Sequence, residues 1–188
     1  MLFRKQSLPV DKMIELEETL SGSILSSIGF AKTDEDLANQ LGLEIRVVDN
    51  DDLPPNTEAT LTKSKNRNFY GLIQVKKKYR VNMFACIHEI MHYVFDVKCN
   101  NYVEKTFERR IKGKTNSQHE QEINYLAAAY SMPYDQMLKA IKEFNESTPK
   151  ADELLFVSDL CKKYGQSRVS VLRRVREVKR IARKRTAF

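Results

Sequence analysis

The segment from residue 81 to residue 95 constrains the fold most, because it is almost entirely apolar and yet carries three chemically active side chains in its middle. These are His88, Glu89 and His92, in the arrangement H-E-x-x-H. Apolar residues on nearly every side are typical of a buried helix. Burying two imidazoles and a carboxylate costs free energy unless they are paired or bind a metal. The segment therefore predicts a central buried helix with a ligand for its polar side chains.

The spacing of His88 and His92 suits a divalent metal ion. Residues four apart lie on one helix face, with Cβ atoms about 5–6 Å apart, so both rings can reach one ion. Glu89 is offset to the side, as suits a carboxylate that acts on a metal-bound water without binding the metal. The alternatives are two satisfied core histidines or a closed structural zinc site. A closed site normally collects cysteines, and Cys86 points about 200° away from His88 and is expected to fill the core.

A third metal ligand is expected from residues 117–133, which are rich in helix formers. Glu120 and Asn124 share one face of that predicted helix, so we assign Glu120 as the ligand. Asn124 would then orient a ligand histidine through the ring nitrogen that the metal does not use, and the alternative is an ordinary polar position. His119 is the second candidate ligand, because a third histidine can also complete such a site.

Two motifs in this order resemble the ImmA/IrrE family of bacterial and phage metallopeptidases, over roughly residues 33 to 175. The first is His88 to His92, and the second combines Glu120 to Ala128 with the terminal Ser131 to Pro133. The chain departs from the family at Met91, where many members have glycine, and at Met83 to Ala85, where Arg-Phe-Thr is often found. Neither departure changes a proposed ligand, so we expect the chemistry to be retained.

The resemblance implies a fold, a cofactor and a substrate. The fold would be α+β, a minimal zincin-like metallopeptidase in which a small sheet packs on the helix of the histidines. Zinc would be bound by His88, His92 and Glu120, with Glu89 as the general base. The substrate would be a helix-turn-helix transcriptional repressor, whose cleavage switches on the genes of a mobile element or a stress response. The donor that stabilises the oxyanion is left open among Tyr70, Tyr79 and Tyr93.

The composition fits a globular protein of one domain, with or without a small appendage. The chain has 188 residues, of which 41% are hydrophobic and 30% are charged. Residues 1–9 lack the apolar core of a signal peptide, and no apolar run reaches the roughly 18 residues that span a bilayer. The three cysteines form no C-x-x-C pair, as suits reduced thiols. We therefore expect a cytoplasmic protein.

Periodicity and turn residues predict the remaining elements. Helices are expected over residues 11–27, 33–41, 133–144, 152–164 and 167–183. Strands are expected over residues 44–49, 59–63 and 68–76, in a small, mostly antiparallel sheet beside the histidine helix. In the last strand one face is apolar, and Gly71 permits a close approach. A substrate peptide can add to the edge of such a sheet, although an ordinary outer strand is the simpler interpretation.

The C-terminal segment is strongly basic. Residues 159–188 hold 11 Lys or Arg against Asp159 and Glu177, so their net charge of +9 exceeds the +7 of the whole chain. Two helices joined by a short turn at residues 165–167 resemble a helix-turn-helix. We therefore predict a metallopeptidase domain over 1–145 and a basic helical segment over 150–188. Its candidate contacts to nucleic acid or a partner are Arg168, Arg173, Arg174, Arg176, Lys179 and Arg180.

The basic segment leaves three interpretations open. It can bind a DNA phosphate backbone, it can be an ordinary solvated face, or it can help the enzyme to meet a repressor on DNA. Two functions of other classes follow. The protein can be a DNA-binding regulator with a non-proteolytic zinc-bearing scaffold, or a zinc-stabilised interaction module without peptidase activity.

Overall fold

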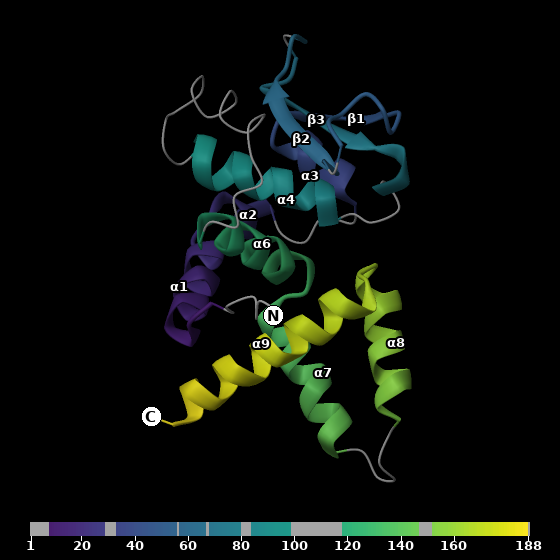
Figure 1. Cartoon of the computed structure of the whole chain (residues 1–188). Coiled ribbons are helices and arrows are strands. Elements are labelled where there is room, and N and C mark those ends of the chain that lie inside the picture. Colours follow the sequence, from purple (N-terminus) through teal and green to yellow (C-terminus); the bar gives the residue numbers. More distant parts are fainter. Residues whose placement is uncertain are drawn as a thin grey trace, which may run out of the picture. The chain divides into compact units, whose positions relative to one another are not determined.

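The computed structural model describes residues 8–28, 33–55, 57–66, 68–79, 84–98, 118–146 and 152–187. The chain forms two compact units, one from Met1–Gly22 with Ser117–Phe188 and the other from Ser23–Asn116. The second unit holds a sheet and helices, and the first is helical (Figure 1), which confirms the α+β class. The linker expected at residues 145–150 lies mostly outside the described residues, and the predicted boundary there stays a prediction.

The sheet of the second unit has the order β1-β3-β2. Its strands are β1 (Leu43–Val48), β2 (Ala59–Lys63) and β3 (Gly71–Lys76). β3 pairs with β2 antiparallel but with β1 parallel, so the sheet is mixed, and the mostly antiparallel prediction was wrong. Alternating residues define the two faces of a strand but not its neighbours. β3 is the central strand, so an added peptide strand would have to pair with β1 or β2.

The apolar face predicted for the third strand is confirmed. Ile73 and Val75 are fully buried. A Cβ at Gly71 would lie 2.8 Å from Leu43 Cδ2, so glycine permits the close approach that the sequence suggested. The helix that carries the histidines, α4 (Phe84–His92), packs against β2 and β3. The expected packing of this helix on a small sheet is therefore present.

Local signals set the ends of the other elements in the second unit. In α3 (Asp34–Gln40), Thr33 accepts a hydrogen bond from the Asp36 amide at 3.0 Å, as a helix N-cap should. Gly42 follows with φ of +73° and ends the helix, as predicted. α4 continues into the π-helix η2 (Tyr93–Lys98). The other described elements of this unit are the short helices α2 (Ile24–Ile28) and η1 (Lys77–Tyr79).

The first unit consists of α1 (Val10–Ser21), α6 (Gln118–Ser131), α7 (Tyr134–Glu146), α8 (Glu153–Tyr164) and α9 (Arg168–Thr186). The single helix predicted over 11–27 ends instead at Gly22, because α2 starts afresh beyond it. α9 contacts α1, α6, α7 and α8 and is therefore the central helix of the unit. None of the helices in the described part of the chain is both long and apolar enough to cross a membrane.

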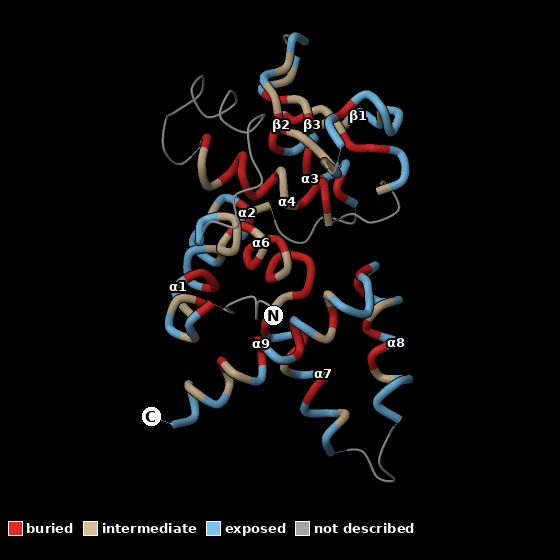
Figure 2. Tube along the Cα trace, viewed as in Figure 1, coloured by how far each residue is buried: buried red, intermediate tan, exposed pale blue. Residues whose placement is uncertain are grey.

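The short turn between α8 and α9 is confirmed. Gly165 adopts the left-handed conformation, with φ of +60°, and Ser167 caps α9. Not all the apolar residues of the two helices are buried: Leu155 and Val169 are 64% and 77% exposed. Figure 2 shows buried and exposed residues alternating along both helices, so each keeps a solvent face.

Arg174 was expected to contact nucleic acid or a partner, and this expectation was wrong. Its side chain is 0% exposed. The guanidinium donates to Glu17 Oε1 at 2.6 Å, to the Met132 carbonyl at 3.0 Å and to the Tyr125 hydroxyl at 3.1 Å. Arg174 therefore joins α9 to α1 and α6, and its buried side chain cannot contact a partner in solution.

Candidate metal centre

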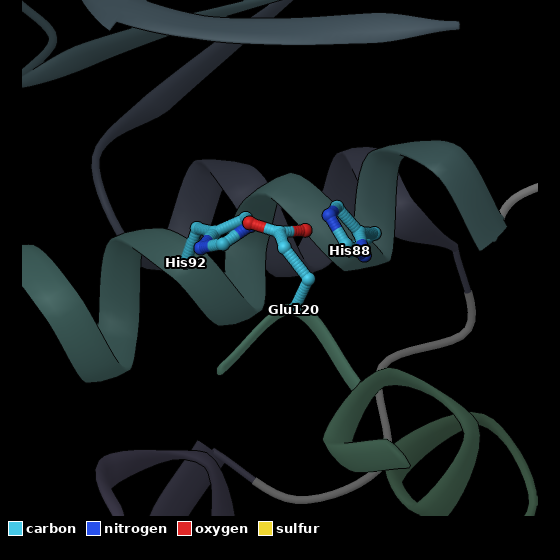
Figure 3. A group of neighbouring side chains, drawn as sticks. All are labelled: His88, His92 and Glu120. Carbon is cyan, nitrogen blue, oxygen red and sulfur yellow. The ribbon is translucent and has the colours of Figure 1, made fainter. Parts of the chain in front are cut away.

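His88 and His92 lie on adjacent turns of α4, as their spacing predicted. Their ring centroids are 4.7 Å apart, with an angle of 80° between the ring planes. One ring nitrogen of each lies within 4.8 Å of the other, and Figure 3 shows both rings on the helix. His92 is only 4% exposed, and His88 is half-buried. Two imidazoles in this arrangement can bind one ion.

Asp96 orients the ring of His92. Its Oδ2 lies 2.7 Å from His92 Nδ1, and both side chains are largely buried. An ionised carboxylate only accepts hydrogen bonds, so Nδ1 is the donor and Nε2 keeps its lone pair for a metal. Carboxylate contacts of this kind are usual behind zinc-binding histidines.

Asp96 was not among the functional residues predicted from the sequence. A carboxylate four residues after a ligand histidine was the available signal, since such pairs face each other on a helix. Asp96 lies in the π-helical part of the segment, and π-helical turns are frequent at functional sites.

Glu89 is half-buried on α4, one residue beyond His88. The groups of described residues that could hold a metal ion do not include this carboxylate. This position is compatible with the predicted role of Glu89, which is to act on a metal-bound water without binding the metal. Cys86 is fully buried and absent from those groups, which confirms it as a core residue.

The other predicted ligand residues lie on α6, in the first unit. Glu120 is half-buried in the first turn, and His119 is exposed beside it. The Asn124 amide donates to the backbone carbonyl of Glu120 at 2.7 Å. Asn124 thus bonds its own helix, and the role predicted for it beside a ligand histidine stays a prediction.

The three tyrosines considered as oxyanion donors differ in their surroundings. Tyr93 is 6% exposed and Tyr70 is 73% exposed. Burial raises the pKa of Tyr93, and interaction with Tyr70 raises that pKa further. Tyr93 is therefore held as a protonated hydrogen-bond donor. Tyr79 is half-buried, with Lys78 Nζ 4.8 Å from its ring centre.

The chain matches a family model and is similar in fold to a solved structure. The model of the IrrE N-terminal-like domain, Peptidase_M78, matches residues 72–176. No curated protein matches the sequence. A solved structure described as a Mycobacterium tuberculosis transcriptional regulator is similar, with a TM-score of 0.50 and 16% identity over 91% of this chain. This chain covers only 48% of that protein, so the likeness concerns the fold alone.

The family match spans more than half of the 188 residues. It includes the histidine pair with Asp96, the α6 residues Glu120 and Asn124, and part of α9. Histidine side chains like those on α4 are common ligands in zinc peptidases. The chain therefore belongs to the ImmA/IrrE-type metallopeptidases, the Peptidase_M78 family with its IrrE N-terminal-like domain.

Proposed function

We propose that the protein is a zinc-dependent endopeptidase in which His88, His92 and Glu120 bind the metal. The observation that carries the proposal is the histidine pair on α4, with the buried His92 oriented by Asp96. Two imidazoles and a carboxylate are a usual donor set for catalytic zinc. Because α6 and α4 belong to different units, Glu120 is assigned from its residue type, its spacing and the family match.

The residues of α4 have separate tasks in the proposed reaction. When bound, zinc would lower the pKa of a water ligand towards about 7 and polarise a peptide carbonyl. Glu89 accepts the proton of the attacking water and passes it to the leaving amine. Asp96 holds the His92 ring by its 2.7 Å contact, so that the ring does not have to reorient during the reaction.

We propose a helix-turn-helix transcriptional repressor as the substrate, cut at a specific site so that mobile-element or stress-response genes are derepressed. Support comes from membership of the IrrE-like family. A DNA-binding regulator with a non-proteolytic scaffold is the second candidate, favoured by the basic α8–α9 pair and its short turn. A zinc-stabilised interaction module is the third, and it predicts that Glu89 is dispensable.

The test is incubation of the purified protein and zinc with the nearest encoded helix-turn-helix repressor. We expect discrete fragments, their loss on chelation, and a rate about 10²- to 10⁴-fold lower in Glu89→Gln at unchanged zinc content. Glu122→Gln is the matched control, because Glu122 lies on α6 and contacts Gln118 and Lys12. Full cleavage by Glu89→Gln would contradict the proposal. Derepression that survives Glu89→Gln but is lost on removal of exposed α9 arginines would instead support the regulator.

A further inference from the structure

α9 carries a row of exposed basic side chains along one face, which we call the basic face. Its members are Arg168, Arg173, Arg176, Lys179 and Arg183. The last four are spaced by 3, 3 and 4 residues. Such intervals keep side chains within one stripe of an α-helix, and Arg168 falls on the same stripe.

The other cations of α9 are engaged inside the first unit. Arg174 is buried against Glu17, and Arg180 donates to the Leu8 carbonyl at 3.3 Å. Lys184 lies 3.4 Å from Asp11, and Arg185 lies over the ring of Tyr134. The helix therefore separates its basic residues into a group that holds the unit together and a group that faces solvent.

Little negative charge offsets the basic face. Glu177 is the only acid of α9, is 8% exposed and pairs with Arg173 and Arg174. In the described part of the chain, no ion pair involves Arg168, Arg176, Lys179 or Arg183. These four charges are thus available to an external polyanion.

The shape of the basic face favours duplex DNA as that polyanion. From Arg168 to Arg183 a helix rises about 22 Å, a straight and rigid row comparable with several successive phosphates of one strand. An anionic membrane fits less well. An interfacial helix inserts its apolar face, whereas Val171, Val178 and Ile181 of α9 are fully buried in the unit.

Features at the start of α9 argue against base-specific reading. In a helix-turn-helix the N-terminal residues of the second helix contact the bases. Here Ser167 and Ser170 bond each other at 2.9 Å, and Val169 projects 77% exposed between them. The basic residues instead run along the whole helix, as suits contact with phosphates.

We propose that the basic face of α9 binds the phosphate backbone of double-stranded DNA without sequence preference. This inference is independent of the peptidase activity. Glu89→Gln, which removes the proposed base in the second unit, should therefore leave DNA binding unchanged.

Fluorescence anisotropy of the full chain with two unrelated labelled 25-base-pair duplexes tests the proposal. We expect both to bind equally, with Kd of about 10⁻⁴ to 10⁻⁶ M near physiological salt. Four phosphate contacts predict a slope of log K against log salt of about −3.6. In the triple variant Arg176→Gln, Lys179→Gln, Arg183→Gln, the slope should fall to about −0.9, and binding should weaken more than about ten-fold.

The matched control is Lys139→Gln, Lys142→Gln, Lys162→Gln, which removes the same charge from exposed positions on α7 and α8. It should keep the parental slope. Equal losses in both triple variants would overturn the proposal, because net charge alone would then explain binding. So would a more than ten-fold preference for one duplex, or binding to vesicles with 30% anionic lipid without binding to duplex. Circular dichroism of each variant checks that α9 is still folded.

Discussion

Each unit contains a cluster of polar side chains among apolar residues. The two clusters balance their polar and charged groups in different ways. On α4 and η2, His88, His92 and Asp96 bring lone pairs and negative charge together. In the first unit, Glu17 and Tyr125 surround a guanidinium, that of Arg174, which supplies the cation from the chain itself. Both clusters lie within apolar surroundings, where unbalanced polar groups are costly.

The two clusters differ in how their polar groups are balanced. In the Arg174 cluster, burial lowers the arginine pKa, but Glu17, Tyr125 and Glu177 together outweigh that effect, and the net pKa is raised. Burial likewise raises the pKa of Tyr125, so its hydroxyl stays a donor to Glu17. These groups satisfy one another. His88, His92 and Asp96 instead offer ring nitrogens and a carboxylate, which are donor types that a divalent metal ion takes.

Arg174→Ala should give the largest effect on stability. It leaves Glu17 buried without its guanidinium partner, and breaking a buried pair typically costs about 3–5 kcal/mol. Urea unfolding followed by circular dichroism measures the loss, which should be the same with and without zinc. The control Arg176→Ala removes an exposed arginine of the same helix and should change stability by no more than about 0.5 kcal/mol. A loss below about 1 kcal/mol in Arg174→Ala would refute the role given to this cluster.

Zinc removal should give the next largest effect. A ligand at 1,000 times its Kd stabilises the folded state by about 4 kcal/mol. Wild-type protein should therefore unfold at a lower temperature after chelation, whereas His92→Ala, which lacks a proposed ligand, should barely respond. Differential scanning calorimetry with and without chelator gives both values. An equal response in the two proteins would place the metal elsewhere.

Asp96→Asn should weaken zinc binding without abolishing it. Loss of a carboxylate behind a ligand histidine typically costs 10- to 100-fold in affinity, about 1.4–2.7 kcal/mol. Competition with a chromophoric chelator measures the change. Asp159→Asn, an exposed acid on α8, is the control and should bind zinc normally. Unchanged affinity in Asp96→Asn would mean that the 2.7 Å contact only packs the helix end.

The sequence predicted what local spacing determines. The four-residue interval between His88 and His92 depends on neighbours in the chain, and it was identified. The neighbours of β3 were not predicted, because alternation does not specify the order of strands. Arg174 was misassigned for a similar reason. Its partners Glu17 and Tyr125 are 157 and 49 residues away, so nothing local distinguished it from the exposed arginines.

Glu177→Gln should have the smallest effect on stability. It tests whether Glu177 is an ionised member of the Arg174 cluster. Burial raises the pKa of Glu177, although Arg174 and Arg173 oppose the shift. The folded state therefore holds this proton to a higher pH than the unfolded state, whose carboxyl titrates near 4.5. The Glu177 contribution to stability is thus fully present below about pH 4.5 and is lost as pH rises through the folded-state pKa. Glutamine mimics the protonated form.

The stability of Glu177→Gln relative to wild type should consequently increase between pH 4.5 and 7. The glutamine stays neutral over this range, whereas the wild-type carboxyl loses its proton and with it the stabilisation of the neutral form. Urea unfolding of both proteins at matched pH values isolates this carboxyl, since the other titrating groups are shared. A difference that does not change with pH, or that changes in the opposite sense, would mean that Arg173 and Arg174 dominate over burial. Glu177 would then be a full ionic member of the cluster, and its Oε2, which has no hydrogen-bond partner in the described structure, would be held by charge alone.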